Sequence, residues 1–171
     1  DNQIANGDGT TEPQGLFNAS GTTDAGSPAG GASAAAQVTD YENMYFGIEK
    51  AFRPPSDRAR TVFIADDTSY KRARAIKVGS SDARRVFGLD EQSYTLMGIP
   101  FKVQNDIGNA KACCANLRHY RMYRRLGVTV RTETGGRTLA LANETLLVLR
   151  MRWAGKLTLG GAMCYIDDME A

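Results

Sequence analysis

Apolar side chains recur at helical spacing in an early segment of the chain. The recurring positions are Tyr41, Met44, Tyr45, Ile48 and Phe52. Thr39 precedes this stripe and Glu42 follows three residues later, which is the spacing of a capping box. Pro54 and Pro55 come directly after Arg53, and residues before proline avoid the α region. The pattern therefore predicts an amphipathic helix from residue 39 to about 52, packed on a sheet.

A short apolar run at 61–65, bounded by charged residues, predicts a buried strand. Asp66 or Asp67 then caps a second helix that runs to about Val78, with basic side chains toward its middle and end, as the helix dipole favours. Two aspartates at a strand end are also a possible metal site. No further carboxylate or histidine lies nearby in sequence, so N-capping is the better interpretation.

The second half of the chain has the pattern of strands. A polar loop is expected at 79–92 and a turn at 106–109. Lys111 to Val130 reads as two strands that separate near Leu126 and Gly127, and 134–137 carries a hairpin signal. The other predicted strands are 94–103 with a break at Gly98, 139–153, and 156–166 after a turn at Ala154 and Gly155. The order helix, strand, helix, then many strands argues for an α+β fold.

The opening stretch from Gly7 to Leu16 has the glycine content of a phosphate-binding loop. Such a loop needs a strand before it and a helix N-terminus after it, and neither is predicted. No Gly-Lys-Ser/Thr follows, and Pro13 has no N–H to donate. We therefore expect a structural turn, followed over residues 17–37 by a flexible loop rich in Gly, Ala, Ser and Thr.

The composition fits one soluble globular domain. The length of 171 residues suffices for a core, and a net charge of +2 predicts neither nucleic-acid nor membrane binding. Three cysteines without C-x-x-C spacing indicate neither a zinc site nor a disulfide framework, so reduced thiols are expected. No apolar run approaches the roughly 20 residues of a membrane helix, and the start has no signal-peptide pattern.

Catalytic candidates are few. His119 is the one histidine, and it stands among four arginines without an orienting acid nearby in sequence. Cys113 and Cys114 lie in an apolar run and read as strand residues that face opposite ways. A cysteine enzyme would need a lowered thiol pKa, and slow thiol labelling at neutral pH would exclude it.

The stretch 118–125 alternates arginine with aromatic residues and is the best nucleic-acid candidate, because cations neutralise phosphates and aromatic rings stack on bases. As a strand it would divide its charge between two faces. One face would carry Arg118, Tyr120, Met122 and Arg124, and the other His119, Arg121, Tyr123 and Arg125. A solvated or subunit-facing strand is therefore favoured, with a nucleic-acid-binding module as the alternative.

The order of several motifs resembles the tailed-phage major capsid proteins of the Hong Kong 97 type. Gly7 to Leu16 resembles the family's "G-x-G-T…P-Q-G-L" entry, and residues 96–103 resemble its "L-x-G-x-P-V" block. The stretches that resemble the remaining blocks are 61–66, 116–122, 125–128 and 149–162. Asp66-Asp67 and Asn116-Leu117 depart from the usual Asn-Pro and Gly-Asp pairs.

The resemblance implies a Hong Kong 97-like axial domain with a mixed sheet, two or three flanking helices and long β segments. The family's N-terminal arm, extended hairpin and spine helix would lie before residue 1, so a C-terminal portion is expected. The implied divisions are a glycine-rich entry at 1–38, an axial-type domain at 39–138, and terminal strands returning to the peripheral domain at 139–171.

The implied function is structural: a capsid subunit that self-associates around five- and six-fold axes and meets packaged double-stranded DNA only non-specifically. The resemblance implies no enzyme activity, cofactor, metal, membrane or small-molecule partner, and a location in the virion after assembly in the host cytoplasm. The isolated chain is expected to be soluble and to assemble poorly. The candidate inter-subunit contacts are Arg84, Arg85, Arg118, Arg121, Arg124 and Arg125.

Some relatives lock their shells with a Lys–Asn isopeptide bond assisted by a glutamate. Asn143 falls in the comparable segment, but Arg150 stands where that glutamate is expected, and the lysine donor would lie before residue 1. Self-crosslinking is therefore disfavoured.

Overall fold

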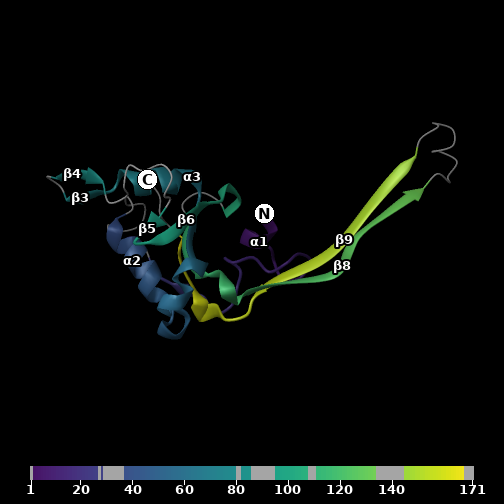
Figure 1. Ribbon diagram of the computed structural model, residues 1–171, viewed down its shortest axis with the longest axis horizontal. Coiled ribbons are helices and arrows are strands. Elements are labelled where there is room, and N and C mark those ends of the chain that lie inside the picture. The colour runs from purple at the N-terminus through teal and green to yellow at the C-terminus, as the bar shows by residue number, and fades with distance from the viewer. Residues whose placement is uncertain are drawn as a thin grey trace.

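A mixed six-stranded sheet organises the body of the protein in the computed structural model, which describes residues 2–26, 28, 37–79, 82–85, 95–107, 111–133 and 145–167. The order across the sheet is β1-β10-β7-β2-β6-β5. The pairs β2–β6 and β1–β10 are parallel, and the pairs β2–β7, β7–β10 and β5–β6 are antiparallel. The strands are β1 (Thr23–Asp24), β2 (Thr61–Ala65), β5 (Thr95–Leu96), β6 (Ile99–Val103), β7 (Ala112–Asn116) and β10 (Met163–Ile166). The mixed sheet with few helices confirms the α+β prediction (Figure 1).

Helix α2 (Val38–Gly47) covers one face of this sheet. Its start differs from the sequence prediction, since the Asp40 carboxylate accepts a hydrogen bond from the Gln37 N–H at 2.7 Å and Gln37 is the N-cap residue. The helix also ends sooner, at Gly47, and Phe52 belongs to a separate 3₁₀ helix, Lys50–Phe52. Of the predicted apolar stripe, Tyr41, Met44 and Tyr45 lie in α2, and Ile48 follows directly after it.

Helix α3 (Asp67–Ala75) follows β2 directly, as predicted. The Asp66 carboxylate accepts hydrogen bonds from the N–H groups of Thr68 and Ser69 at 3.0 and 3.1 Å, so Asp66 is the N-cap. The helix stops at Ala75 rather than near residue 78, because the chain enters strand β3 (Lys77–Gly79). This strand pairs in antiparallel fashion with β4 (Asp82–Arg85), so residue 79 and residues 82–85 of the expected polar loop are in strands.

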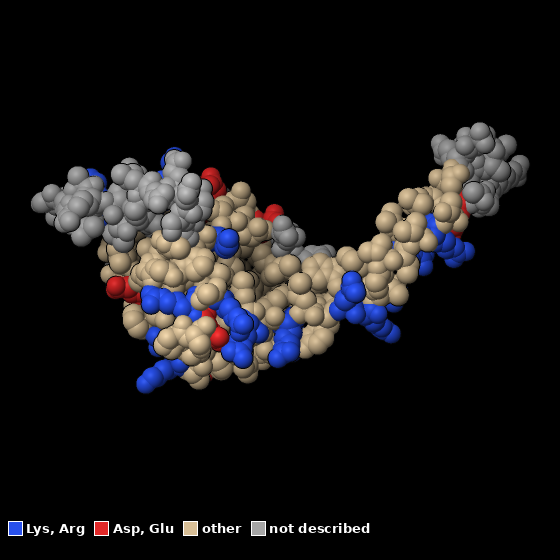
Figure 2. All heavy atoms as spheres, in the orientation of Figure 1, with Lys and Arg blue, Asp and Glu red and all other residues tan. Residues whose placement is uncertain are grey.

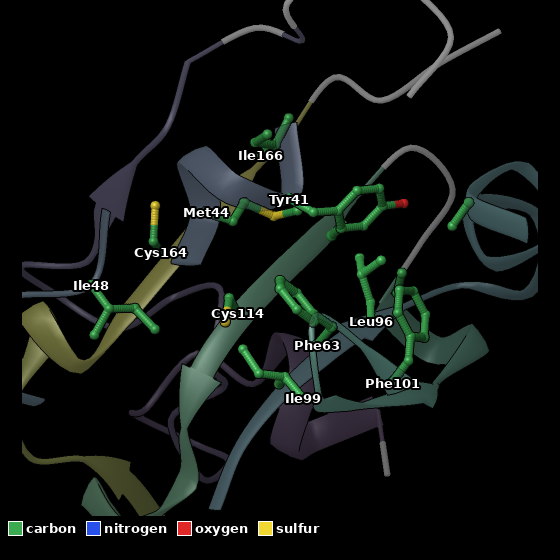
Figure 3. Packing of buried hydrophobic residues seen from close by; sticks show 13 residues of the cluster. Tyr41, Met44, Ile48, Phe63, Leu96, Ile99, Phe101, Cys114, Cys164 and Ile166 are labelled. Atoms are coloured by element: carbon green, nitrogen blue, oxygen red, sulfur yellow. The ribbon is translucent and has the colours of Figure 1, made fainter. Parts of the chain in front are cut away.

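The core lies between α2 and the sheet (Figure 3). Tyr41 and Met44 of α2, and Ile48 directly after it, are fully buried against side chains of five strands. The Tyr41 ring meets Phe63 edge to face, with 5.7 Å between ring centroids. The other core residues labelled in Figure 3 are Leu96, Ile99, Phe101, Cys114, Cys164 and Ile166. This burial fixes β2, β6 and β7 as the rigid platform of the body.

Two long strands leave the body as an arm. Within the described part of the chain, strands β8 (Tyr120–Glu133) and β9 (Leu146–Leu157) pair only with each other, and Figure 1 shows them projecting well beyond the sheet. Among the described residues, no helix is long and apolar enough to cross a membrane.

The breaks in the second half of the chain lie elsewhere than predicted. The strand over 111–130 is interrupted by the 3₁₀ helix Leu117–His119, because the Asn116 side chain accepts a hydrogen bond from the Arg118 N–H and turns the chain. The turn predicted at Ala154 and Gly155 is wrong, since β9 runs through both residues. The strand predicted at 156–166 is divided by the 3₁₀ helix Gly160–Ala162. The predicted hairpin residues 134–137 lie outside the described residues.

Candidate inter-subunit surface

The arm formed by β8 and β9 is exposed along most of its length. It has no third strand and no helix over either face in the described structure, so its side chains meet solvent on both sides. A two-stranded ribbon is at best marginally stable in water without a covering layer. The arm is therefore the part of the molecule that most needs a partner.

One face of the outer arm is apolar. The register pairs Val130 with Leu149, so these two side chains share a face, and alternation along β9 adds Leu147 and Met151. Their exposed fractions are 59%, 63%, 56% and 53%, respectively. We call these four residues the apolar face. Contiguous exposed apolar side chains of this kind mark interaction sites.

The opposite face of the arm is basic. Arg121 pairs with Lys156, and alternation along the unbulged strand β9 places Arg152 and Arg150 on the same side. Arg131 pairs with Val148, which lies on the same side of β9, so Arg131 belongs to this face as well. We call these five residues the cationic face. In Figure 2, Lys and Arg side chains gather along the lower side of the arm, while the upper side is largely uncharged.

Two irregularities in β8 together preserve this division. The register shifts between Arg124 and Leu126 and again between Leu126 and Thr129, and each shift gives β8 one residue more than β9. The predicted split of the arginine-aromatic stretch holds for the strand residues before the first shift. Tyr120, Met122 and Arg124 share one face and Arg121 and Tyr123 the other.

The root of the arm is fastened to the N-terminal loop. The Tyr120 hydroxyl donates to the Gln14 carbonyl at 2.9 Å, and the Gln14 N–H donates to the Gly155 carbonyl at 2.8 Å. A Cβ at Gly155 would collide with the Tyr120 hydroxyl, so the glycine lets the tyrosine cross the strand. These contacts fix the direction in which the arm leaves the body.

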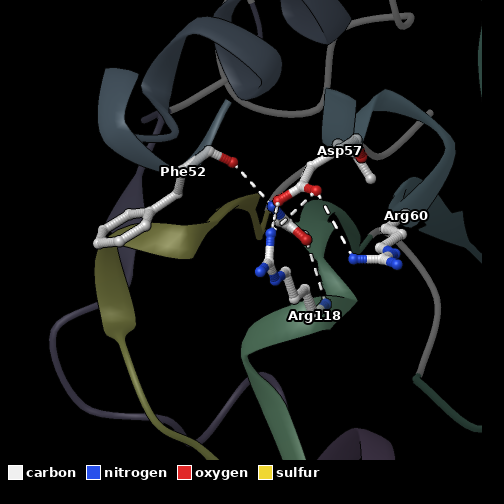
Figure 4. A network of polar contacts seen from close by, with 6 residues as sticks. Phe52, Asp57, Arg60 and Arg118 are labelled. Carbon is white, nitrogen blue, oxygen red and sulfur yellow. Dashed lines mark hydrogen bonds and ion pairs between the residues drawn. The ribbon is translucent and has the colours of Figure 1, made fainter. Parts of the chain in front are cut away.

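A buried carboxylate secures the turn that precedes the arm (Figure 4). The Arg118 guanidinium donates to Asp57 Oδ2 at 3.0 Å and Oδ1 at 3.2 Å, and the Asn116 amide donates to the Phe52 carbonyl at 2.9 Å. Hydrogen bonding to Arg118 holds the pKa of Asp57 below its ordinary value, against the opposing effect of burial. Arg60 lies farther away, with 3.7 Å between Nη1 and Oδ1.

The predicted contact residues therefore lie in three places. Arg121, Arg124 and Arg125 are exposed on β8, whereas Arg118 is bonded within its own chain. Arg84 and Arg85 lie on β4. The candidate crosslink acceptor Asn143 lies outside the described residues. Sequence reasoning missed the contribution of β9, although the alternation Leu147, Leu149, Met151 against Arg150 and Arg152 is visible in the sequence.

The glycine-rich opening forms a closed structural turn. It follows a short helix, α1 (Asn2–Asn6), and the Asp8 side chain accepts hydrogen bonds from the N–H groups of Thr10, Thr11 and Glu12 at 2.8 to 3.1 Å. These bonds, with the Thr11 hydroxyl, lower the pKa of Asp8 to about 2. The backbone donors that a phosphate would use are thus taken by a carboxylate of the same loop.

The cysteines and the histidine form no reactive arrangement among the described residues. Cys113, Cys114 and Cys164 are free and buried, and desolvation raises the pKa of Cys113 to about 12 and that of Cys164 to about 11. The His119 ring packs edge-on against Phe52, with 5.0 Å between centroids. No group of three or more His, Cys, Asp or Glu in the described part of the chain could hold a metal ion.

A family model and several solved structures match this chain. The model of the phage capsid family matches residues 1–168. The capsid of the native GTA particle is 16% identical, with a TM-score of 0.75, and the match covers 99% of this chain and 66% of that one. The capsid of the empty GTA particle is 14% identical, with a TM-score of 0.70, covering 99% and 60%.

A third match is the holo-SrpI encapsulin complex from Synechococcus elongatus, which is 14% identical with a TM-score of 0.63 and coverages of 99% and 60%. The chain thus spans 60% to 66% of the length of these three structures. At such low identity the likeness shows the fold. No curated protein matches the chain.

Proposed function

Because this chain belongs to the phage capsid family, we propose that it is a shell-forming major capsid subunit that associates with copies of itself. The observation that carries the proposal is the arm, whose apolar face is not covered by any of the described residues. Shell subunits need complementary surfaces repeated by symmetry rather than catalytic residues. The arm supplies such a surface at a distance from the core, where neighbouring copies can reach it.

The apolar face gives the association its driving force. Full burial of one large aliphatic side chain contributes about 1.5–3 kcal/mol, and these four side chains are each a little over half exposed. Covering all four would therefore contribute several kcal/mol, of the order needed to hold a weak contact in a many-copy assembly. Weak contacts multiplied around a closed shell give a stable particle.

The finer parts of the proposal follow the resemblance. The subunits adopt the Hong Kong 97-like arrangement, assemble around five- and six-fold axes in the cytoplasm of a bacterial host, and enclose DNA in the virion. The chain acts without a cofactor or small-molecule substrate. Matches to the two GTA capsid structures and to an encapsulin support the shell architecture.

A nucleic-acid-binding module on residues 118–125 is less well supported. Its proposed residues divide between the two faces of β8, with Tyr120 and Arg124 opposite Arg121 and Tyr123. The family match also gives no support to such a module.

Two variants of one strand test the proposal. Leu149→Glu places a charge on the apolar face, and Leu146→Glu makes the same change at an exposed leucine of the same strand on the other face. Each is expressed with everything its gene encodes on either side, and particles are counted by electron microscopy and sedimentation. We expect Leu149→Glu to abolish closed particles and Leu146→Glu to retain them. Particle formation by both variants, or none by the unaltered protein, would contradict the proposal.

A further inference from the structure

Charge is distributed unevenly between the arm and the rest of the chain. Strands β8 and β9 carry seven Lys or Arg residues and one carboxylate, Glu133. The whole chain has a net charge of only +2, so the remainder is net acidic. A low overall charge therefore conceals a strongly basic arm.

Most charges of the cationic face lack an ion-pair partner within the part of the chain that the structure describes. Arg121 and Lys156 are directly opposite each other, an arrangement of like charges that is unfavourable in a free ribbon. Among the described residues, no carboxylate forms an ion pair with Arg121, Arg150, Arg152 or Lys156. Only Arg131 has one, with 3.2 Å between its Nε and Glu133 Oε1. An external anion would relieve the repulsion.

The spacing of these cations suits a linear polyanion. Arg150, Arg152 and Lys156 lie along one regular strand, and the six residue steps from the first to the last span about 20 Å. A DNA duplex presents one phosphate charge per roughly 1.7 Å of its axis, so a row of this length passes about twelve phosphates. The row can neutralise several of them at once.

An aromatic side chain and a hollow lie at the inner end of the same face. Tyr123 shares this face with Lys156 and is 56% exposed. A hollow of about 300 Å³ opens beside it, lined by Gly9, Gln14 and Ala154 among others. An exposed ring beside cations is the combination by which proteins contact single-stranded nucleic acid without reading its sequence.

We infer that the cationic face binds the phosphate backbone of nucleic acid, while the opposite apolar face packs on a neighbouring subunit. The two faces point in opposite directions, so one arm meets protein and DNA at the same time. The inference rests on the proposed function only in identifying the polyanion as enclosed DNA. The phosphate contact itself rests on the charge, spacing and exposure of the cationic face.

Two triple variants with equal charge loss test the inference. The first neutralises the row, and the second neutralises three exposed lysines of the body. The first is Arg150→Gln/Arg152→Gln/Lys156→Gln, and the control is Lys50→Gln/Lys71→Gln/Lys77→Gln. A labelled random-sequence DNA duplex is titrated with each purified protein between about 50 and 200 mM salt, the range over which phosphate contacts weaken steeply.

We expect the first variant to lose affinity and to lower the slope of log K against log salt by about 2.7, since each phosphate contact contributes about 0.9. The control variant should keep most of its affinity and most of the slope of log K against log salt. Equal losses of affinity and slope in both variants would overturn the inference. So would an unchanged slope in the first variant.

A separate measurement distinguishes DNA from a second copy of the chain. Sedimentation without DNA should show the same self-association for both triple variants. If the first variant loses self-association while its DNA affinity matches the control, the cationic face binds the acidic body of another copy and the inference is wrong. Failure of Leu149→Glu to affect particle formation would instead count against the proposed function and leave the DNA titration unchanged.

Discussion

The guanidinium of Arg118 lies 3.0 Å from the carboxylate of Asp57, although 60 residues of sequence separate them. Asp57 belongs to the 3₁₀ helix Pro55–Arg60, and Arg118 to the turn that precedes the arm. The pair therefore joins the root of the arm to the segment between α2 and β2. The Asp57 side chain is only 5% exposed, so removing its partner leaves a charge with poor access to water.

The variant Arg118→Gln should destabilise the chain more than Arg60→Gln does. Arg118 makes two hydrogen bonds to Asp57, whereas Arg60 approaches one oxygen at 3.7 Å and is 61% exposed. Urea unfolding monitored by circular dichroism compares the two. A larger loss of unfolding free energy in Arg60→Gln than in Arg118→Gln would mean that Arg60 is the main partner of Asp57, which contradicts this prediction.

Acidification should weaken the same contact. The pKa of Asp57 is lowered in the folded chain from an ordinary value of 3.8, so its contribution is present above that pH and is lost as the pH falls below it. The difference in unfolding free energy between the unaltered chain and Asp57→Asn should therefore be larger at pH 7 than at pH 3. A difference in unfolding free energy that is larger at pH 3 than at pH 7 would contradict this prediction.

Asp8 should titrate at an unusually low pH for an aspartate on the surface. Three backbone N–H groups and the Thr11 hydroxyl stabilise its charged form and bring its pKa to about 2. The side-chain carbonyl resonance of Asp8, followed by NMR, should move with a midpoint near 2. In Thr11→Val the midpoint should rise, because one donor is removed. A midpoint near 3.8 in the unaltered chain would mean that the loop is open in solution.

Gly15→Ala should cost about 1–3 kcal/mol of unfolding free energy, the usual range for overpacking. A Cβ at this position would collide with backbone atoms of Ala5 and Asn6 in α1. Backbone atoms cannot move aside by a change of rotamer, as the end of a side chain can. Gly127→Ala is the matched control, because a Cβ there meets nothing within 4 Å. Thermal unfolding of the two variants measures the difference. Equal stability would place α1 away from the loop.

The three thiols should react slowly with a neutral disulfide reagent at pH 8. The thiolate is the reactive form, and burial raises the pKa of all three cysteines above the ordinary value of 9.0. Labelling should become fast once urea unfolds the chain. Rapid labelling of Cys113 or Cys114 in the folded protein would revive the cysteine-enzyme alternative.

Local signals predicted the body better than the arm. The strand 61–65 and its Asp66 cap were predictable because a short apolar run and a cap lie side by side in sequence. Gly155 shows where local signals fail. A glycine in sequence usually indicates a turn, but this one lies inside a strand, where the Tyr120 side chain passes too close for a Cβ. Its strand position depends on Tyr120, which is 35 residues away in sequence.

The surface of the arm was harder to predict because it depends on pairing. The alternation within β8 correctly predicts that Arg121 and Arg124 lie on different faces. It does not show that β9 adds three cations to the face of Arg121, because that depends on the pairing of the two strands. The two register shifts also interrupt the period-2 pattern of β8. The sequence marks the second shift only by Gly127.

The two extra residues of β8 have a consequence for the way such a chain tolerates change in length. Loss of one of them would restore regular pairing locally and leave Val130 opposite Leu149 and Arg131 opposite Val148, because β9 has no extra residue. A bulge bends its strand and increases the local twist, so the loss would change the direction of the outer arm while each face kept its side chains. The two extra residues between Arg124 and Thr129 therefore set where the outer arm points more than they set which residues it presents.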